Sequence, residues 1–242
     1  MLILQWQCSD KKSQIPRESQ IILTRIYFKI NYMKIVVFGA SGKTGALLLG
    51  RALEKGHLVT AYVRREGSIA QKHPNLRKIT GSLYDSAKLE EAISGADACF
   101  STLGGGSLTK HTPALVSGID RIVTLMEKLG TKRFIYLSSI GAGESRYFMG
   151  PVIRFLVADV FLRVPLADHN TNEQRITKSK LQWTIVRPGG LTDGPKTGNM
   201  KNGNGKTILK GSPKISRANV ASFMLEQLEE KAHINKGVWL YE

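Results

Sequence analysis

Three glycines, each three residues after the last, follow the first clearly apolar run of the chain. The run Ile35–Phe38 has the length of a short strand, and Gly39-Ala-Ser-Gly42-Lys-Thr-Gly45 comes directly after it. Residues 44–55 then place leucine and alanine at helical spacing before Gly56 ends the pattern. A tight turn between a strand and a helix directs backbone N–H groups and the helix N-terminus at an anionic group such as a pyrophosphate. The order of strand, glycine turn and helix therefore predicts a dinucleotide-binding βα unit.

Strand-like and helix-like segments alternate along the rest of the chain. Such alternation is typical of an α/β protein whose helices cover both faces of a parallel sheet. We therefore predict a Rossmann-type, doubly wound, mainly parallel sheet in a single domain. The expected strands are Leu58–Val63, Leu76–Thr80, Ala98–Ser101, Arg133–Leu137 and Trp183–Val186, and the expected helices are Ala87–Ile93 and Pro113–Leu129.

Residues 1–32 do not share this organisation. They mix charged residues with short apolar pieces and have no clear period, whereas Met33 opens the first strand. No continuous apolar core with a small-residue cleavage site is present, which disfavours a signal peptide. We expect residues 1–32 to be a disordered or misannotated extension. Residues 33–242 are expected to form the NAD(P)-binding domain, with a small C-terminal segment on the substrate side.

Composition and charge limit the compartment and the partners. The chain has 242 residues, and no run approaches the roughly 18 apolar residues of a membrane helix. Cys8 and Cys99 lie far apart, and no histidine, cysteine or carboxylate spacing is typical of a metal site. We expect a soluble, cytoplasmic monomer or homodimer with no metal and no membrane partner. The net charge of +16 could attract nucleic acid, but the basic residues are spread along the whole chain without a recognition motif, which favours small anions instead.

Two arginines stand where the second predicted strand ends. An NAD enzyme places a carboxylate there to hold the ribose hydroxyls, but this chain reads Tyr62-Val-Arg64-Arg65. A guanidinium can pair with the 2′-phosphate of the adenosine and stack on the adenine. We therefore expect NADP(H) to be preferred, with NAD(H) as the alternative, and Arg64 to be a stronger candidate than Arg65.

Five motifs follow one another along the chain: Lys34-Ile-Val-Val-Phe-Gly-Ala-Ser-Gly-Lys-Thr-Gly45, Val63-Arg64, Thr102-Leu-Gly104, Leu137-Ser-Ser139 and Val186-Arg-Pro-Gly189. From Met33 to the C-terminus the chain resembles the atypical short-chain dehydrogenase/reductases. Within them it is most similar to the NAD(P)H-binding group that includes bacterial NADH-flavin reductases and biliverdin reductase B, also called flavin reductase. These motifs specify a cofactor far better than a substrate.

The resemblance implies roles for residues at the carboxyl ends of the strands. Ser138 is expected beside the cofactor, and Ser139 is expected to contact the substrate or the nicotinamide, although strand-end serines often serve only as caps. The remaining implied contacts are Gly39, Ser41, Gly42, Lys43, Thr44 and Gly45 with the pyrophosphate, Arg64 with the 2′-phosphate, Ser82 and Leu83 on the adenine side, Leu103 and Gly104 beside the nicotinamide ribose, and Pro188, Gly189, Gly190 and Leu191 facing the nicotinamide.

The chain departs from the family in its catalytic residues. Typical members use Tyr-X-X-X-Lys, in which the phenol donates a proton and the ammonium lowers its pKa. When the chain is aligned on the segment 179–188, the positions expected to hold this pair carry Pro165 and His169. Carbonyl reduction by the usual route is therefore disfavoured. Asp168-His169 matches an Asp-His of biliverdin reductase B and makes His169 a catalytic candidate, but Gly190 replaces a histidine of that enzyme, which disfavours biliverdin as the substrate.

Hydride transfer does not require the missing pair, because a flavin or quinone accepts hydride into a conjugated system that solvent can protonate. The leading hypothesis is therefore an NADPH-dependent oxidoreductase acting on a flavin- or quinone-like acceptor. A non-catalytic, NADP(H)-sensing regulatory protein is the alternative, because binding survives without the pair. A sugar-nucleotide epimerase or dehydratase comes third, since that chemistry needs the absent tyrosine.

Two further segments allow more than one interpretation. Residues 194–217 carry six basic residues and no acid, which could attract an anionic substrate but is more typical of a solvated loop. Residues 151–164 are apolar around most of a helical circumference, and we expect them in the core rather than at a pocket wall or a dimer face.

Overall fold

The computed structural model describes residues 32–104, 109–151, 154–155, 161–203 and 213–242. The chain divides into two units, Met1–Tyr32 and Met33–Glu242. Of the first unit only Tyr32 is described, so the predicted N-terminal extension otherwise lies outside the described residues. No helix in the described part of the chain is long and apolar enough to cross a membrane.

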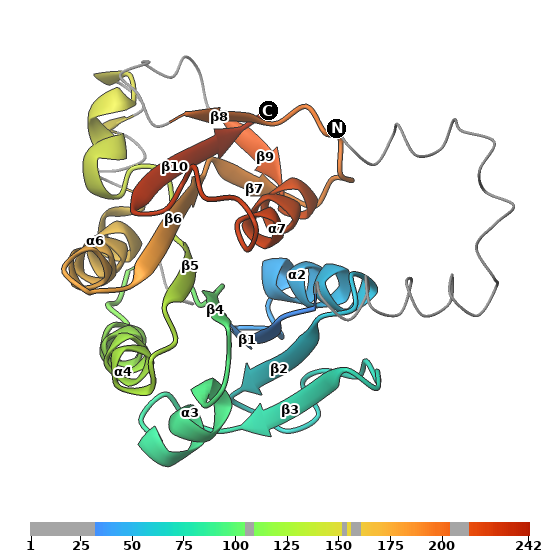
Figure 1. The fold of residues 1–242 in the computed structure, drawn as a ribbon. Helices are drawn as coiled ribbons and strands as arrows, with labels where there is room; N and C mark the ends of the chain where they lie inside the picture. Colours follow the sequence, from blue (N-terminus) through green and yellow to red (C-terminus); the bar gives the residue numbers. More distant parts are fainter. Residues whose placement is uncertain (1–31, 105–108, 152–153, 156–160, 204–212) are drawn as a thin grey trace, which may run out of the picture. The chain divides into compact units, whose positions relative to one another are not determined.

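The second unit is built from alternating strands and helices (Figure 1). The strands are β1 (Lys34–Phe38), β2 (Leu58–Val63), β3 (Leu76–Thr80), β4 (Ala98–Ser101), β5 (Arg133–Leu137), β6 (Gln182–Pro188), β7 (Gly190–Thr192), β8 (Lys201–Gly203), β9 (Lys214–Ser216) and β10 (Lys236–Tyr241). The helices are α2 (Lys43–Glu54), α3 (Ser86–Ile93), α4 (Pro113–Leu129), the 3-10 helix η3 (Gly143–Phe148), α6 (Arg163–Thr177) and α7 (Arg217–Glu226).

The strands form one large sheet in the order β3-β2-β1-β4-β5-β6-β10-β8. All neighbouring pairs are parallel except β10 with β8, which is antiparallel. The first six positions follow the Rossmann order, in which the direction of winding reverses beside the first strand. The predicted fold class is therefore confirmed, and the reversal between β1 and β4 leaves a crevice at the carboxyl edge of the sheet.

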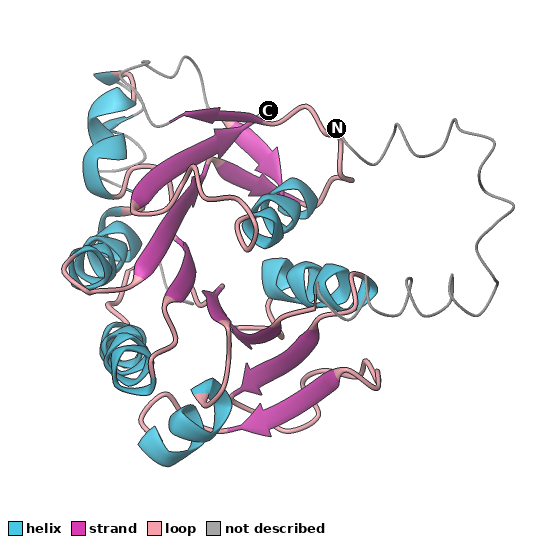
Figure 2. Ribbon diagram, in the orientation of Figure 1, coloured by secondary structure: helices cyan, strands magenta, loops and turns pink. Residues whose placement is uncertain are grey.

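Helices cover both faces of this sheet (Figure 2). Strand β1 explains why, because its successive side chains point to opposite faces and all of them after Lys34 are buried. Ile35 and Val37 pack in a cluster that includes residues of α2 and α7, whereas Val36 and Phe38 pack in a cluster that includes residues of α3 and α4. A strand that is buried on both sides positions the turn at its end rigidly.

The C-terminal third departs from two expectations. The segment predicted as a solvated loop contains β8 and β9, and β9 pairs with β7 in a separate parallel sheet; residues 204–212 lie outside the described residues. The core assignment of residues 151–164 is wrong for Phe155 and Phe161, whose exposed fractions are 60% and 65%. Apolar composition alone does not show which side of a helix has a partner.

Candidate active site

The glycine turn after β1 is tightly packed against the end of β4. Gly39 has φ +82° and lies against Thr102, whose Oγ1 donates to the carbonyl oxygens of Phe38 and Gly39, at 3.1 Å each. A Cβ on Gly45 would collide with the Gly39 carbonyl oxygen and would lie 2.6 Å from Thr102 Oγ1. Only glycine fits at these two positions, because one requires a left-handed backbone and the other leaves no room for a side chain.

Helix α2 begins directly behind this turn, and the helix itself offers no acceptor to its first amides. Its N-cap, Gly42, provides no side-chain hydrogen bond, and its first turn holds no acidic residue. The amides of Lys43, Thr44 and Gly45 therefore have no acceptor within the helix. A helix start with free N–H groups and a positive dipole end favours an anion such as a pyrophosphate. The residues present thus fit the phosphates of a dinucleotide.

A first cavity, of about 510 Å³, extends from the glycine turn past the ends of β2 and β3; we call it the Arg64 cavity. Tyr62 supports its wall, because its hydroxyl donates to the Ser82 carbonyl oxygen at 2.8 Å. Arg65 is exposed and lines neither this cavity nor the next. The predicted residues that line the Arg64 cavity are Gly39, Ser41, Gly42, Arg64, Ser82, Leu83, Leu103 and Gly104.

A second cavity, of about 750 Å³, lies on the other side of the turn; we call it the His169 cavity. It shares Gly42, Thr102, Leu103 and Gly104 with the first, so the two cavities adjoin along the carboxyl edge of the sheet. The other predicted residues that line it are Lys43, Thr44, Ser138, Ser139, His169, Pro188, Gly189, Gly190 and Leu191.

Sequence reasoning missed several residues of these walls. Thr102 lines both cavities, and its place directly after β4 was a usable signal because strand ends meet at this edge. Met149, Leu162, Pro213 and Arg217 line the His169 cavity from later segments of the chain. Leu162 lies in the apolar segment 151–164, and Pro213 and Arg217 lie in the basic segment 194–217. These patterns do not show which of their residues reach the cavity, because that depends on how the C-terminal third folds back.

The two serines after β5 have different environments. Ser138 is buried, and its Oγ donates to Glu173 Oε1 at 2.6 Å. Ser139 is half-buried, and its Oγ donates to the Ile140 carbonyl oxygen at 3.1 Å. Both line the His169 cavity, but the hydroxyl of Ser138 is held by a buried carboxylate, which leaves Ser139 as the freer of the two hydroxyls.

Glu173 forms a buried ion pair with Arg187 behind the cavity, and the more exposed Glu144 also contacts Arg187. Arg187, which is 3% exposed, donates to Glu173 through Nε and Nη2 and to Glu144 through Nη1 and Nη2, at 2.7–3.0 Å. Burial alone would lower the pKa of Arg187, but these four hydrogen bonds raise it above its usual value. The guanidinium therefore stays charged and ties α6 and η3 to β6.

Pro165 and His169 lie one helical turn apart on α6, so the positions aligned with the usual pair do share a helix face. His169 lines the cavity, and its Nδ1 lies 2.8 Å from Tyr136 Oη on β5. Burial lowers the pKa of His169, although Glu173 and Asp168 act in the opposite direction. The ring is therefore enclosed rather than free at the surface, and it packs edge-on against Tyr136.

Two groups of charged residues lie near His169, and one of them lines the His169 cavity. Asp193 joins Lys43 of the glycine turn to Arg217 of α7, with N–O distances of 2.8 and 2.6 Å. Asp168 is buried and accepts from the Thr112 amide at 2.9 Å, with His111 Nδ1 at 2.7 Å. Lys43 and Arg217 line the cavity and outnumber the carboxylate between them, so its rim carries a positive charge.

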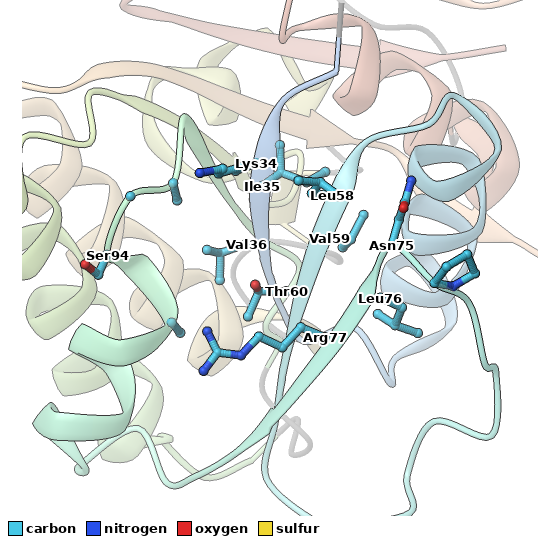
Figure 3. Close-up of a pocket in the computed structure, with 14 residues that line it drawn as sticks. Lys34, Ile35, Val36, Leu58, Val59, Thr60, Asn75, Leu76, Arg77 and Ser94 are labelled. Carbon is cyan, nitrogen blue, oxygen red and sulfur yellow. The ribbon is translucent and has the colours of Figure 1, made fainter. Parts of the chain in front are cut away.

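A third hollow, of about 370 Å³, lies at the opposite edge of the sheet, beside the starts of β1, β2 and β3 (Figure 3). Arg77 extends past Thr60 and Val36 there and forms an ion pair with Glu91. None of the predicted site residues lines this hollow. In Rossmann proteins ligands bind at the carboxyl edge, so it is not the candidate active site.

Comparison with known proteins identifies the cofactor class. A family model described as NAD(P)H-binding matches residues 39–231, from the glycine turn to the end of α7 and beyond. The chain belongs to this NAD(P)H-binding family. Its cofactor is thus an NAD(P)H-type dinucleotide, as predicted, and the resemblance to atypical short-chain dehydrogenase/reductases is confirmed.

The chain is also similar to individual proteins. It is 32% identical over 206 residues to the uncharacterised chloroplastic protein At2g34460 of Arabidopsis thaliana, covering 81% of this chain and 71% of that protein. It is 28% identical over 216 residues to the uncharacterised sugar epimerase YhfK of Bacillus subtilis (strain 168), covering 87% and 94%. Among solved structures, the anaerobillin reductase ChuY of Escherichia coli O157:H7 matches with a TM-score of 0.72 at 25% identity, covering 86% of this chain and 97% of that one.

Proposed function

We propose that this protein is an NADPH-dependent oxidoreductase that transfers hydride to a flavin- or quinone-like acceptor without a Tyr-Lys pair. The observation that carries the proposal is the His169 cavity. It adjoins the glycine turn, its size suits a small planar ligand, and among its described lining residues glycine and apolar side chains predominate and tyrosine is absent. Such a wall suits an aromatic acceptor whose ring is stacked and then protonated by solvent.

Each side of the site has its own task in this proposal. The amides at the start of α2 hold the pyrophosphate, and Arg64 holds the 2′-phosphate that distinguishes NADPH. When bound, the nicotinamide supplies the hydride. Leu103 and the segment 188–191 form the walls against which the rings lie and exclude water. Ser139 and His169 offer polar contacts to the acceptor at the far side of the cavity.

Two alternatives have different consequences. A sensor binds the dinucleotide and consumes none, which the absence of tyrosine from the described cavity wall equally allows. A sugar-nucleotide epimerase requires a phenol near the substrate, and the buried Tyr136 hydroxyl lies behind His169 rather than in the wall. We therefore favour the reductase, a class also named for the relative from Escherichia coli.

The test is turnover with purified protein. NADPH and NADH are each mixed with FMN, riboflavin and a panel of quinones, and the loss of nicotinamide absorbance is followed against heat-denatured protein. Saturable consumption of NADPH with one acceptor class is the expected result. Tight NADPH binding without consumption across the panel would overturn the proposal in favour of the sensor.

A further inference from the structure

Tyr136 joins two residues of α6 behind the His169 cavity. It is fully buried on β5, and its Oη lies 2.8 Å from His169 Nδ1 and 3.1 Å from Asn172 Nδ2. His169 and Asn172 stand three residues apart, so both side chains leave the same face of the helix. One phenol therefore holds both of these side chains.

The chemistry of the three groups fixes the direction of the hydrogen bonds. The amide nitrogen of Asn172 can only donate, so Tyr136 Oη accepts from it. The hydroxyl proton of Tyr136 then goes to an unprotonated His169 Nδ1, because if Nδ1 donated as well, the proton of this buried hydroxyl would have no acceptor among the described residues. An imidazole that accepts at Nδ1 carries its proton on Nε2.

If Oδ1 and Nδ2 of Asn172 exchanged places, the hydrogen bonds would run in the opposite direction. The burial of the amide disfavours this exchange. In the orientation described, Asn172 Oδ1 is buried without a partner. The reversed orientation would bury an NH₂ group with at least one unpaired donor, and buried unpaired N–H groups are less tolerated than carbonyl oxygens. The described orientation is therefore the more favourable one.

The Asp168 and Glu173 carboxylates raise the pKa of the His169 ring, but both already accept hydrogen bonds from other groups. The Asp168 carboxylate is occupied by the Thr112 amide and His111, and the Glu173 carboxylate by Ser138 and Arg187. The charged residues that line the cavity itself, Lys43 and Arg217, are cations and add no negative charge that would favour an imidazolium. Burial has the larger effect and lowers the pKa of His169, which favours a neutral ring.

The second ring nitrogen is available to a ligand. Among the described residues no hydrogen-bond partner contacts His169 Nε2. Because His169 lines the cavity while Nδ1 is held by Tyr136, Nε2 is the ring nitrogen that can meet an acceptor there.

We propose that Tyr136 and Asn172 are positioning residues that hold His169 as a neutral Nε2–H donor in its cavity. This donor selects acceptors that carry a carbonyl oxygen or an unsaturated ring nitrogen where negative charge develops. The acceptor gains a hydride from the reduced dinucleotide, the Nε2–H hydrogen bond stabilises the resulting anion, and water supplies the proton. A neutral imidazole acts as such an electrophile in other enzymes because it binds the anion without losing its own proton.

The first test needs no substrate. Two-bond ¹H–¹⁵N spectra of the full-length, ¹⁵N-labelled protein at pH 7.5 report the tautomer of each histidine, and His169→Gln assigns the signal. The expected pattern for His169 is the neutral Nε2–H form. A neutral Nδ1–H pattern or an imidazolium pattern in the wild type would overturn the proposal.

Two variants test the positioning residues. Tyr136→Phe removes the donor to Nδ1, and the expected spectrum is a mixture of tautomers; a wild-type pattern would contradict the role of Tyr136.

Asn172→Asp replaces the amide donor with a carboxylate that accepts the Tyr136 hydroxyl proton. His169 Nδ1 must then donate to Tyr136 Oη, so the expected spectrum shows a proton on Nδ1. If the buried carboxylate prevents this variant from folding, the tautomer spectrum of Tyr136→Phe alone tests the positioning role. Tyr147→Phe, at an exposed tyrosine, is the matched control with a wild-type spectrum.

The second test rests on the proposed function. With the acceptor that supports turnover, Tyr136→Phe is expected to lower kcat about tenfold, as loss of one oriented hydrogen bond does, while the Kd for NADPH changes less than about twofold. An unchanged kcat would overturn the selection of acceptors by Nε2–H. If the spectra show the proposed tautomer but no acceptor supports turnover, the proposed function is overturned and the positioning role remains.

Discussion

The guanidinium of Arg187 donates two hydrogen bonds to the carboxylate of Glu173, from Nε to Oε1 at 3.0 Å and from Nη2 to Oε2 at 2.8 Å. Both side chains are at most 5% exposed. The pair joins the end of β6 to the middle of α6, and Glu173 also accepts from Ser138 at the cavity wall. Packing at the candidate active site therefore depends on a buried ion pair that the sequence motif does not reveal.

Glu173→Gln tests this pair. It leaves a buried guanidinium with Glu144 as its remaining carboxylate, and breaking one side of a buried ion pair costs about 3 kcal/mol. Urea unfolding should show a loss of that size. The matched control is Glu90→Gln, which breaks a surface pair with Lys128 and should cost less than about 1 kcal/mol. Equal losses in the two variants would contradict the structural role of Glu173.

Gly45→Ala tests the packing of the glycine turn. The added Cβ would collide with the Gly39 carbonyl oxygen, so the turn must move, at a cost of about 1–3 kcal/mol, and dinucleotide affinity should fall. Gly50→Ala is the control in the same helix, because nothing lies within 4 Å of its Cβ. That change should stabilise the protein by about 0.5–1 kcal/mol and leave binding intact. Thermal unfolding and dinucleotide titration measure both effects.

Arg64→Ala tests the cofactor preference. If the guanidinium holds the 2′-phosphate, NADPH binding should weaken about tenfold or more, since charge-assisted hydrogen bonds are lost, while NADH binding changes less than about twofold. Arg65→Ala removes the same charge outside the cavity and should have a much smaller effect. Calorimetric titration with both dinucleotides measures the difference. Parallel losses for NADPH and NADH would refute the 2′-phosphate assignment.

The protein should lose stability as the pH falls from 7.5 to 5.5. Burial lowers the pKa of His57, and Lys55 lowers it further, while His57 Nδ1 accepts from the Met33 amide at 3.1 Å. The pKa of His57 in the folded protein therefore lies below its value near 6.5 in the unfolded chain. Above pH 6.5 the folded state has its full stability, and below it the unfolded chain gains a proton first, so the free energy of unfolding falls. Burial acts in the same direction on His169 and His233.

Urea unfolding at a series of pH values measures this dependence. The carboxylates with lowered pKa titrate below this window, so histidines dominate it. His57→Gln should reduce the difference in unfolding free energy between pH 7.5 and pH 5.5. A difference that is absent in the wild type, or unaltered in this variant, would show that His57 does not contribute.

The sequence by itself determined the N-terminal two thirds of the sheet and the side of the site that faces the phosphates. Strands β1 to β5 and helices α2, α3 and α4 have bounds at or within two residues of those expected. All of these strands except the edge strand β3 are largely buried, apolar runs, and the helices between them are strongly periodic. The glycine turn is local as well: a strand, three glycines and a helix start suffice to create its free amides.

Only the tertiary structure decided the far side of the site. Strands β7 to β10 are short or irregularly patterned, and β10 lies beside β6, some fifty residues earlier in the chain, so no local signal shows the pairing. Tyr136 and His169 are 33 residues apart, and they meet because Tyr136 points from β5 to the face of the sheet that α6 covers. A hydrogen bond between two elements exists only after both are packed, which is why the sequence suggested His169 but could not supply its partner.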